Sequence, residues 1–251
     1  SFNFDGYSNT YSKSFGSAIP YIQNNSDFTR KMIFGGVRFG ADYSMNAKNT
    51  ISFSTWLNTR KFSGDEYLTS TSFDSSNSVV DFYKQSRTTN NDDGFESEFT
   101  LSYKKDFDFK GRVLTADAFF SNGPETSSSQ RRKDFYTPAG VLTDQYPEME
   151  KTSTDEPGKR LTIQTDYVSP IGNGGRLESG VKAILRKDNS NYLVWESDST
   201  TQSWILNQIY SNDFTYMEQI YSGYASYSNT WGKLSYMGGV RLEQSFTKSE
   251  Q

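Results

Sequence analysis

The side chains of this sequence that could act chemically are its carboxylates, because its 251 residues include neither cysteine nor histidine. Thiol nucleophiles, histidine general bases and zinc sites built from these residues are therefore excluded. Two pairs of acids, Glu148 with Glu150 and Asp155 with Glu156, are candidate acid–base carboxylates. Both pairs lie in a polar, proline-containing stretch that does not fix their separation, and simple solvation is the alternative. The sequence therefore favours a protein that is not an enzyme.

Aromatic and basic side chains in the polar stretches indicate binding rather than catalysis. Trp195, Trp204 and Tyr210 could stack on a sugar or another ring, with packing among loops as the alternative. Arg131, in the run Arg131-Arg132-Lys133, could bind anionic lipopolysaccharide or could simply be solvated. These four residues, Trp195, Trp204, Tyr210 and Arg131, are the predicted ligand-binding residues.

A calcium site is the last chemical candidate. The run from Asn90 to Gly94 offers carboxylate and carbonyl oxygens, but it lacks the twelve-residue loop pattern, and a solvated turn is the alternative. The formal net charge of -4 leaves no basic patch for nucleic acid. We therefore predict no metal, no cofactor and no nucleic-acid partner.

The elements that must position these residues are strands, because apolar and polar residues alternate along much of the chain. Alternating runs flank short turns at 44–49, 106–111, 169–175 and 229–233. Much longer polar stretches join the hairpins; they are 63–82 with 84–94, 122–159 and 188–213. Short turns on one side and long loops on the other are typical of a transmembrane β-barrel, with periplasmic turns and extracellular loops. Several strands are expected to continue past the membrane before they turn.

Composition supports a barrel over its rivals. The chain is 33% hydrophobic but 16% aromatic, which suits strands that place only every second residue in lipid. No apolar run approaches the roughly 20 residues that a membrane helix needs. A soluble β-sandwich is the structural alternative, but its connections are usually short at both ends.

Alternation also assigns side chains to two faces of the predicted wall. The predicted lumen-facing residues are Arg38, Asp42, Glu98, Asp117, Asp166, Glu178, Lys182, Arg241 and Glu243. They could line a substrate path or dock a plug, or they could only form cross-strand ion pairs. The predicted anchors at the membrane interface are Tyr43, Tyr167, Trp231 and Tyr236, because a ring with a polar tip suits the headgroup region. Trp56 interrupts a polar set and indicates a lumen contact or a bulge.

The strand count predicts a wall that is not closed. With Phe2–Phe15 as a first strand, the count is about nine. An odd number of strands with open edges is not tolerated in hydrocarbon. Residues 1–251 are therefore interpreted as part of one larger all-β, antiparallel barrel domain, without a plug or signal peptide.

Two ordered passages, Gln164–Lys182 and Tyr221–Glu243, resemble the outer-membrane β-barrel family related to TonB-dependent receptors, which is common in Bacteroidota. The second contains Gly-x-Arg-x-Glu at Gly239, a weak motif alone that gains specificity from the ordered set. The resemblance implies a barrel of about 22 strands with an N-terminal plug, in the outer membrane of a Gram-negative bacterium. It also implies import of a nutrient bound at the extracellular loops, with energy supplied through TonB.

Partners follow from the same resemblance. Outer-membrane lipid and lipopolysaccharide are expected around the barrel, and TonB would act through an N-terminal region that residues 1–251 do not show. The alternative function is structural, namely a barrel that scaffolds a surface lipoprotein or belongs to a secretion or assembly complex. The sequence does not identify the ligand.

Overall fold

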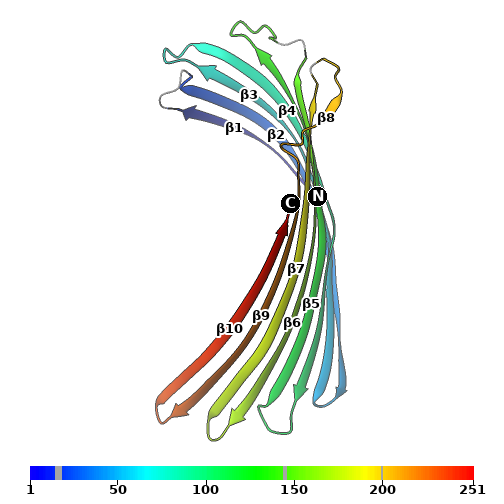
Figure 1. Cartoon of the computed structure of the whole chain (residues 1–251), viewed down its shortest axis with the longest axis vertical. Coiled ribbons are helices and arrows are strands. Elements are labelled where there is room, and N and C mark those ends of the chain that lie inside the picture. The colour runs from blue at the N-terminus through cyan, green and yellow to red at the C-terminus, as the bar shows by residue number, and fades with distance from the viewer. Residues whose placement is uncertain (15–18, 144–145, 199) are drawn as a thin grey trace.

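The computed structural model of the chain is a single antiparallel sheet without a helix among its described residues, which are 1–14, 19–143, 146–198 and 200–251, with only the backbone of 90–93. Neighbours in sequence are neighbours in the sheet, in the order β1-β2-β3-β4-β5-β6-β7-β9-β10, with short β8 beside β7 (Figure 1). The strands are β1 (Phe2–Lys13), β2 (Tyr21–Asn46), β3 (Asn49–Phe73), β4 (Val79–Asp106), β5 (Val113–Tyr136), β6 (Glu148–Ile171), β7 (Gly175–Ser197), β8 (Trp204–Leu206), β9 (Asn212–Trp231) and β10 (Leu234–Glu250). The nine long strands confirm the predicted count.

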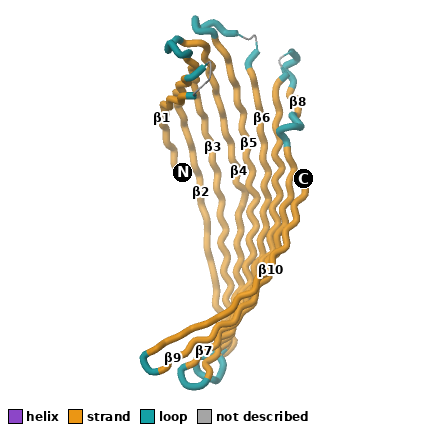
Figure 2. The backbone as a smooth tube through the Cα atoms, turned by 60° about the vertical axis from the view of Figure 1, so that its left-hand side comes forward, coloured by secondary structure: helices purple, strands orange, loops and turns teal. Residues whose placement is uncertain are grey.

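The four short turns predicted from the sequence all lie at one end of the sheet, as expected. Residues 47–48, 107–112, 172–174 and 232–233 connect the strands there (Figure 2). Gly232 has a φ of 61°, a left-handed conformation that glycine adopts without steric cost, so the chain reverses within two residues. At the opposite end, the described connecting residues include 74–78, 137–143, 146–147, 200–203 and 207–211. We call the two ends the short-turn end and the long-connection end.

Much of the predicted loop sequence is strand, which corrects the boundaries given above. The stretches 63–82 and 84–94 belong largely to β3 and β4, which meet in a turn of only a few residues at 74–78. Strands β5, β6 and β7 likewise extend through most of 122–159 and into 188–197. A ladder pairs backbone groups whatever the side chains are, so polar sequence does not end a strand. The strands thus continue well into the predicted loops, and where they leave the membrane remains a prediction.

The sheet has no second layer of described residues against either face. Val194 is the single buried hydrophobic side chain among them, whereas Val240 and Leu242 are 72% and 78% exposed. A soluble sandwich would bury one of its faces against a second sheet. The described residues therefore do not form a sandwich. Within the described residues, no helix is long and apolar enough to cross a membrane.

The outermost strands β1 and β10 each pair with one neighbour, so the described sheet is a curved, open wall (Figure 1). Strand edges expose unpaired backbone groups, and these are costly to leave in hydrocarbon. Closure of the wall by further strands remains a prediction.

Candidate functional site

The register of the ladders places alternate residues on two opposite faces of the sheet. One face carries a row that runs from β2 to β10 through Tyr43, Ile51, Tyr103, Ala116, Thr165, Val181, Gly223 and Leu242. The next row toward the long-connection end is Ala41, Phe53, Leu101, Ala118, Ile163, Ala183, Tyr221 and Gln244. We call this the apolar face. Phe53 packs between Phe39 and Phe99 on it, with ring centroids 6.2 and 6.4 Å away.

The apolar face has the height of a bilayer core. On β10 it extends from Tyr236 to Phe246, a separation of ten residues (246 − 236). For strands tilted by about 40°, each residue advances about 2.5 Å along the membrane normal, which gives about 25 Å. An outer-membrane barrel has an apolar band of about that height. The strand length and the side-chain pattern therefore both indicate that this segment spans a membrane.

The four predicted interface anchors lie on the apolar face toward the short-turn end. Tyr167 contacts the Phe107 ring edge-on at 6.1 Å, and Tyr236 lies 6.4 Å from Tyr227. Trp231 is 82% exposed beside its turn, and Tyr43 is 68% exposed. Their depth in a membrane remains a prediction.

The opposite face, which we call the polar face, carries all nine predicted lumen-facing residues. One of its rows runs through Asp42, Ser52, Ser102, Asp117, Gln164, Lys182, Ser222 and Glu243. Arg241 donates to Glu243 at 2.7 Å, and Arg176 contacts Glu178 at 2.8 Å. Ion pairs between residues two positions apart on one strand thus account for some of these charges. That the polar face lines a lumen stays a prediction.

Trp56 also lies on the polar face, and no bulge occurs at its position. It pairs in register with Arg38, whose guanidinium lies 5.4 Å from the indole centroid. A Cβ at Gly36 would lie 2.7 Å from the Trp56 ring, so the ring covers this glycine closely. Of the two alternatives for Trp56, the structure therefore excludes the bulge.

A compact cluster on the polar face joins three strands. The Tyr224 hydroxyl on β9 donates to Asp166 Oδ1 on β6 at 2.6 Å, and Gln164 donates to Asp166 Oδ2 at 2.6 Å. Gly180 on β7 lies between them; a Cβ there would be 2.4 Å from Asp166 Oδ1 and 2.6 Å from the Tyr224 ring. The missing side chain lets Tyr224 reach across β7.

Toward the long-connection end, the polar face carries a charged row that we call the charged belt. It consists of Glu66, Arg87, Arg131, Glu150 and Glu196, which are register partners on consecutive strands β3 to β7. Arg131 Nη2 donates to Glu150 Oε2 at 2.6 Å, Ser26 donates to Glu66 at 2.6 Å, and Asn207 donates to Glu196 at 3.0 Å. Each acid thus has a partner that orients it.

Two small cavities lie along the charged belt. One of about 220 Å³ is lined by Arg30, Phe62, Glu66 and Arg87, and one of about 280 Å³ is lined by Arg131, Glu150 and Glu196. Arg87 forms no ion pair with any side chain that the structure describes, so its guanidinium is available to an anionic group of a ligand. Arg87 was not among the predicted binding residues, because the polar sequence of 84–94 indicates a loop.

The four predicted ligand-binding residues fall in three different places. Trp195 pairs with Lys151 and with Leu206 of β8, and Lys151 Nζ lies 4.0 Å from the Trp204 ring centroid. The two tryptophans are therefore neighbours on the side of the apolar face, whereas Arg131 is on the polar face. Tyr210 is 63% exposed in the connection before β9. They do not form one site.

The structure also places the acid pairs and the calcium candidate. Asp155 and Glu156 are adjacent in β6 and point to opposite faces, and Glu150 is engaged by Arg131. Among the described residues, no group of three or more acids could hold a metal ion. The side chains of Asn90–Asp93 lie outside the described residues.

An antiparallel wall with one apolar and one polar face, tight turns at one end and a band of bilayer height defines the class of outer-membrane β-barrels. A family model described as "Outer membrane protein beta-barrel family" matches residues 105–251, which is more than half of the chain. The chain belongs to this family, and its location is the outer membrane. Searches of curated proteins and of solved structures gave no match.

Proposed function

We propose that the chain is part of the wall of a TonB-dependent-receptor-like barrel, of the type found in Bacteroidota, in a Gram-negative outer membrane. The barrel binds a nutrient at its extracellular end and mediates its import. The charged belt is the observation that carries this proposal. It brings side chains of both signs to one row on the polar face, at the end where outer-membrane barrels carry their extracellular loops.

The charged belt fits a solute that carries charge. The Arg87 guanidinium would donate hydrogen bonds to a carboxylate or phosphate of the solute, and the acids Glu66 and Glu196 would face its cationic groups. From the belt, the solute would pass the polar row that contains Asp117, Gln164 and Lys182. Nothing in this path calls for chemistry on the solute. TonB would supply energy through a region outside these residues.

Uptake by strains that produce the full-length protein tests the proposal. A deletion strain is first grown on single nutrient sources to find the one whose use depends on the gene. Arg87→Gln with Glu66→Gln should then lower uptake of that nutrient by about tenfold, as expected from loss of one charge-assisted contact. A protonophore should abolish the uptake that remains.

The matched control removes one positive and one negative charge at a similar height on the opposite face. Arg132 and Asp134 on β5 form such a pair, with Nε and Oδ2 2.8 Å apart. Arg132→Gln with Asp134→Asn should leave uptake unchanged at equal surface levels on immunoblots. Equal uptake by the two double variants would contradict import along the polar face.

One observation favours the alternative, a barrel that scaffolds a surface lipoprotein or belongs to a secretion or assembly complex. Trp195, Trp204 and Lys151 lie together on the side of the apolar face, near the long-connection end, where a solute inside a barrel would not reach them. Aromatic side chains are enriched at protein interfaces. A stoichiometric lipoprotein that co-purifies, without any uptake defect on deletion, would support this alternative and contradict import.

A further inference from the structure

A row of lysines borders the apolar face on the side of the long-connection end. Lys159 on β6 is the register partner of Lys187 on β7, which pairs with Met217; Met217 in turn pairs with Lys248 on β10. The next row toward the short-turn end is Leu161, Leu185, Gln219 and Phe246. The ammonium groups therefore stand at the upper boundary of the membrane-spanning band. We call Lys159, Lys187 and Lys248 the lysine row.

The charges of the lysine row are not balanced within the described residues. Lys248 forms an ion pair with Glu250, and the same carboxylate also interacts electrostatically with Lys187. Three lysines thus share one described acid, and neither Lys159 nor Lys187 forms an ion pair with an acid that the structure describes. Like charges directly opposite each other on neighbouring strands are destabilising. The Lys159–Lys187 pair therefore favours an anion from outside the chain.

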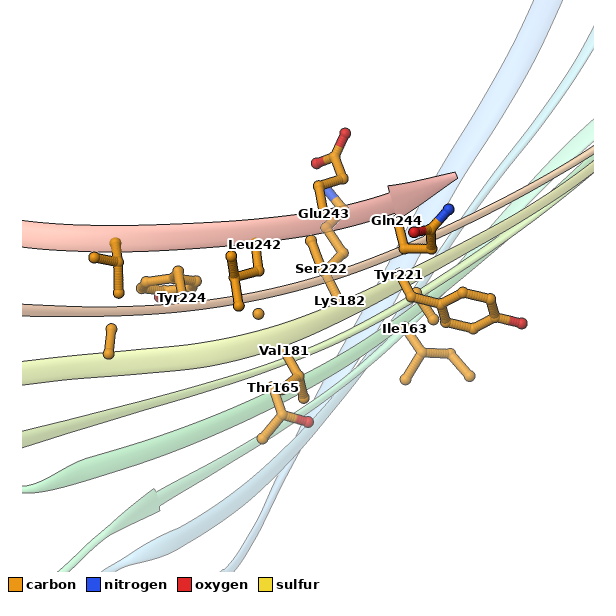
Figure 3. A pocket seen from close by; sticks show the side chains of 14 residues that line it. Ile163, Thr165, Val181, Lys182, Tyr221, Ser222, Tyr224, Leu242, Glu243 and Gln244 are labelled. Carbon is orange, nitrogen blue, oxygen red and sulfur yellow. The ribbon is translucent and has the colours of Figure 1, made fainter. Parts of the chain in front are cut away.

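A groove opens in the apolar face below the lysine row. It has a volume of about 870 Å³ and is lined by Ile163, Val181, Ala183, Gly223 and Leu242, among others. The groove is deepest over Ala183 and Gly223, because these residues have small side chains or none. The side chains of Val181 and Leu242, which are 63% and 78% exposed, form its sides. Figure 3 shows Leu242, Val181 and Ile163 along the groove, with the Glu243 carboxylate turned away from them.

The groove lies within reach of a lipid whose headgroup is at the lysine row. From Lys187, Ala183 is four residues along β7 and Val181 is six, which corresponds to about 13 to 20 Å of strand. An acyl chain that fills one leaflet extends through about 15 Å of hydrocarbon. Headgroup and chain could thus occupy both features at once.

We propose that the lysine row and the groove form a binding site for one lipopolysaccharide molecule of the outer leaflet. A phosphate of its lipid A moiety lies between Lys159 and Lys187, and one acyl chain lies in the groove over Gly223. The long-connection end faces the cell exterior in this class of barrel, which places the lysine row in the leaflet that carries this phosphorylated lipid. This inference does not depend on what the barrel imports.

The site differs from the one that the basic run on β5 predicts. Arg131 is on the polar face and bonds to Glu150, and Arg132 bonds to Asp134 through two hydrogen bonds of 2.8 and 2.9 Å. Both arginines already have carboxylate partners. The lysine row combines an excess of positive charge with an adjacent apolar groove.

Native mass spectrometry of the delipidated full-length protein in detergent tests the site. The probes are bisphosphorylated lipid A, dephosphorylated lipid A with the same acyl chains, and inorganic phosphate. Lys159→Ser with Lys187→Ser should weaken binding of bisphosphorylated lipid A by roughly 30-fold, which is about 2 kcal/mol at 1.4 kcal/mol per tenfold. The same variant should bind the dephosphorylated form as the unmodified protein does.

Two further variants separate the headgroup from the groove. Lys110→Ser with Lys233→Ser removes the same charge from exposed turns at the short-turn end and should leave every affinity unchanged. Gly223→Leu should weaken both forms of lipid A equally, because it fills the groove. The atoms nearest to a Cβ at Gly223 are 3.8 and 3.9 Å away, so the backbone accepts a side chain there.

Three results would overturn the proposal. The first is equal lipid A binding by the two lysine double variants. The second is complete displacement of lipid A by inorganic phosphate, which would leave the groove without a role. The third is loss of a co-purifying protein or of a dimer in Gly223→Leu with unchanged lipid A binding, which would assign the groove to a protein.

Discussion

Replacing Gly180 by alanine tests the idea that this glycine exists to let Tyr224 reach Asp166. The added Cβ would lie 2.4 Å from Asp166 Oδ1 and 2.8 Å from the backbone oxygen of Thr165, so one of these groups must move. Overpacking typically costs about 1–3 kcal/mol, and loss of a hydrogen bond to a charged group costs about 1.5–3 kcal/mol. Since the two effects share the same displacement, we expect a loss of about 2–4 kcal/mol in the free energy of unfolding.

Urea unfolding of the full-length barrel in detergent micelles, followed by tryptophan fluorescence, measures this loss. Gly223→Ala on the neighbouring strand is the matched control, because its Cβ would meet nothing closer than 3.8 Å. We expect that control to be neutral or to gain up to about 1 kcal/mol, since alanine restricts the unfolded chain.

A double-mutant cycle with Tyr224→Phe completes the test. Phenylalanine keeps the ring but removes the hydroxyl that donates to Asp166 at 2.6 Å. If the two residues act through one contact, the double variant should lose less stability than the two single variants added together. A Gly180→Ala protein within about 0.5 kcal/mol of the unmodified barrel would refute the reasoning.

Further predictions concern the membrane band and the connections. Val181→Arg, near the bilayer midplane, should lower the free energy of unfolding by about 2–4 kcal/mol, whereas Ser222→Arg on the polar face should lower it little. Equal losses in unfolding measurements in bilayers would contradict the assignment of the two faces. Trp231 fluorescence should be quenched by lipids brominated near the headgroup, and quenching only by lipids brominated near the chain end would contradict its role as an anchor. Backbone N–H groups of Thr201 and Thr200 and the Thr201 hydroxyl hold the pKa of Asp198 below its ordinary value. The turn they form should therefore be fully ordered above the ordinary carboxyl pKa and should loosen as the pH falls through the lowered one; Thr201 amide exchange, with Asp198→Ala as the control lacking this pH dependence, measures it.

The sequence predicts the fold best where lipid forces alternation. Along 234–246 the residues that face lipid must be apolar and those between them need not be, so both the strand and its faces follow from the pattern. The turn at Gly232 is predictable for a similar reason, because glycine and a reversal of the pattern coincide there. The same reasoning places Arg241 and Glu243 on one face.

The pattern fails outside the membrane band. Residues 63–73 and 79–94 lie beyond the apolar band, where nothing requires alternation, so polar residues occur at successive positions and the pattern indicates a loop. Ladder pairing nevertheless continues, with Glu66 opposite Arg87 and Arg87 opposite Arg131. The charged belt could not be predicted, because it depends on cross-strand register over strands whose sequence carries no alternation. The lysine row was hidden for the same reason, since Lys159 and Lys187 are distant in sequence.

The length of the strands beyond the apolar band has a consequence for what can approach the cell. On β5, the segment from Gly123 to Tyr136 spans 14 residues, or about 45 Å of continuous strand, above the lysine row. Such a paired wall is much stiffer than a loop of the same length. It would hold the entrance of the barrel clear of the carbohydrate layer that surrounds it. Antibodies and bacteriophages would therefore meet a rigid collar of strands, and the connections at its rim would be the parts most open to immune or phage selection.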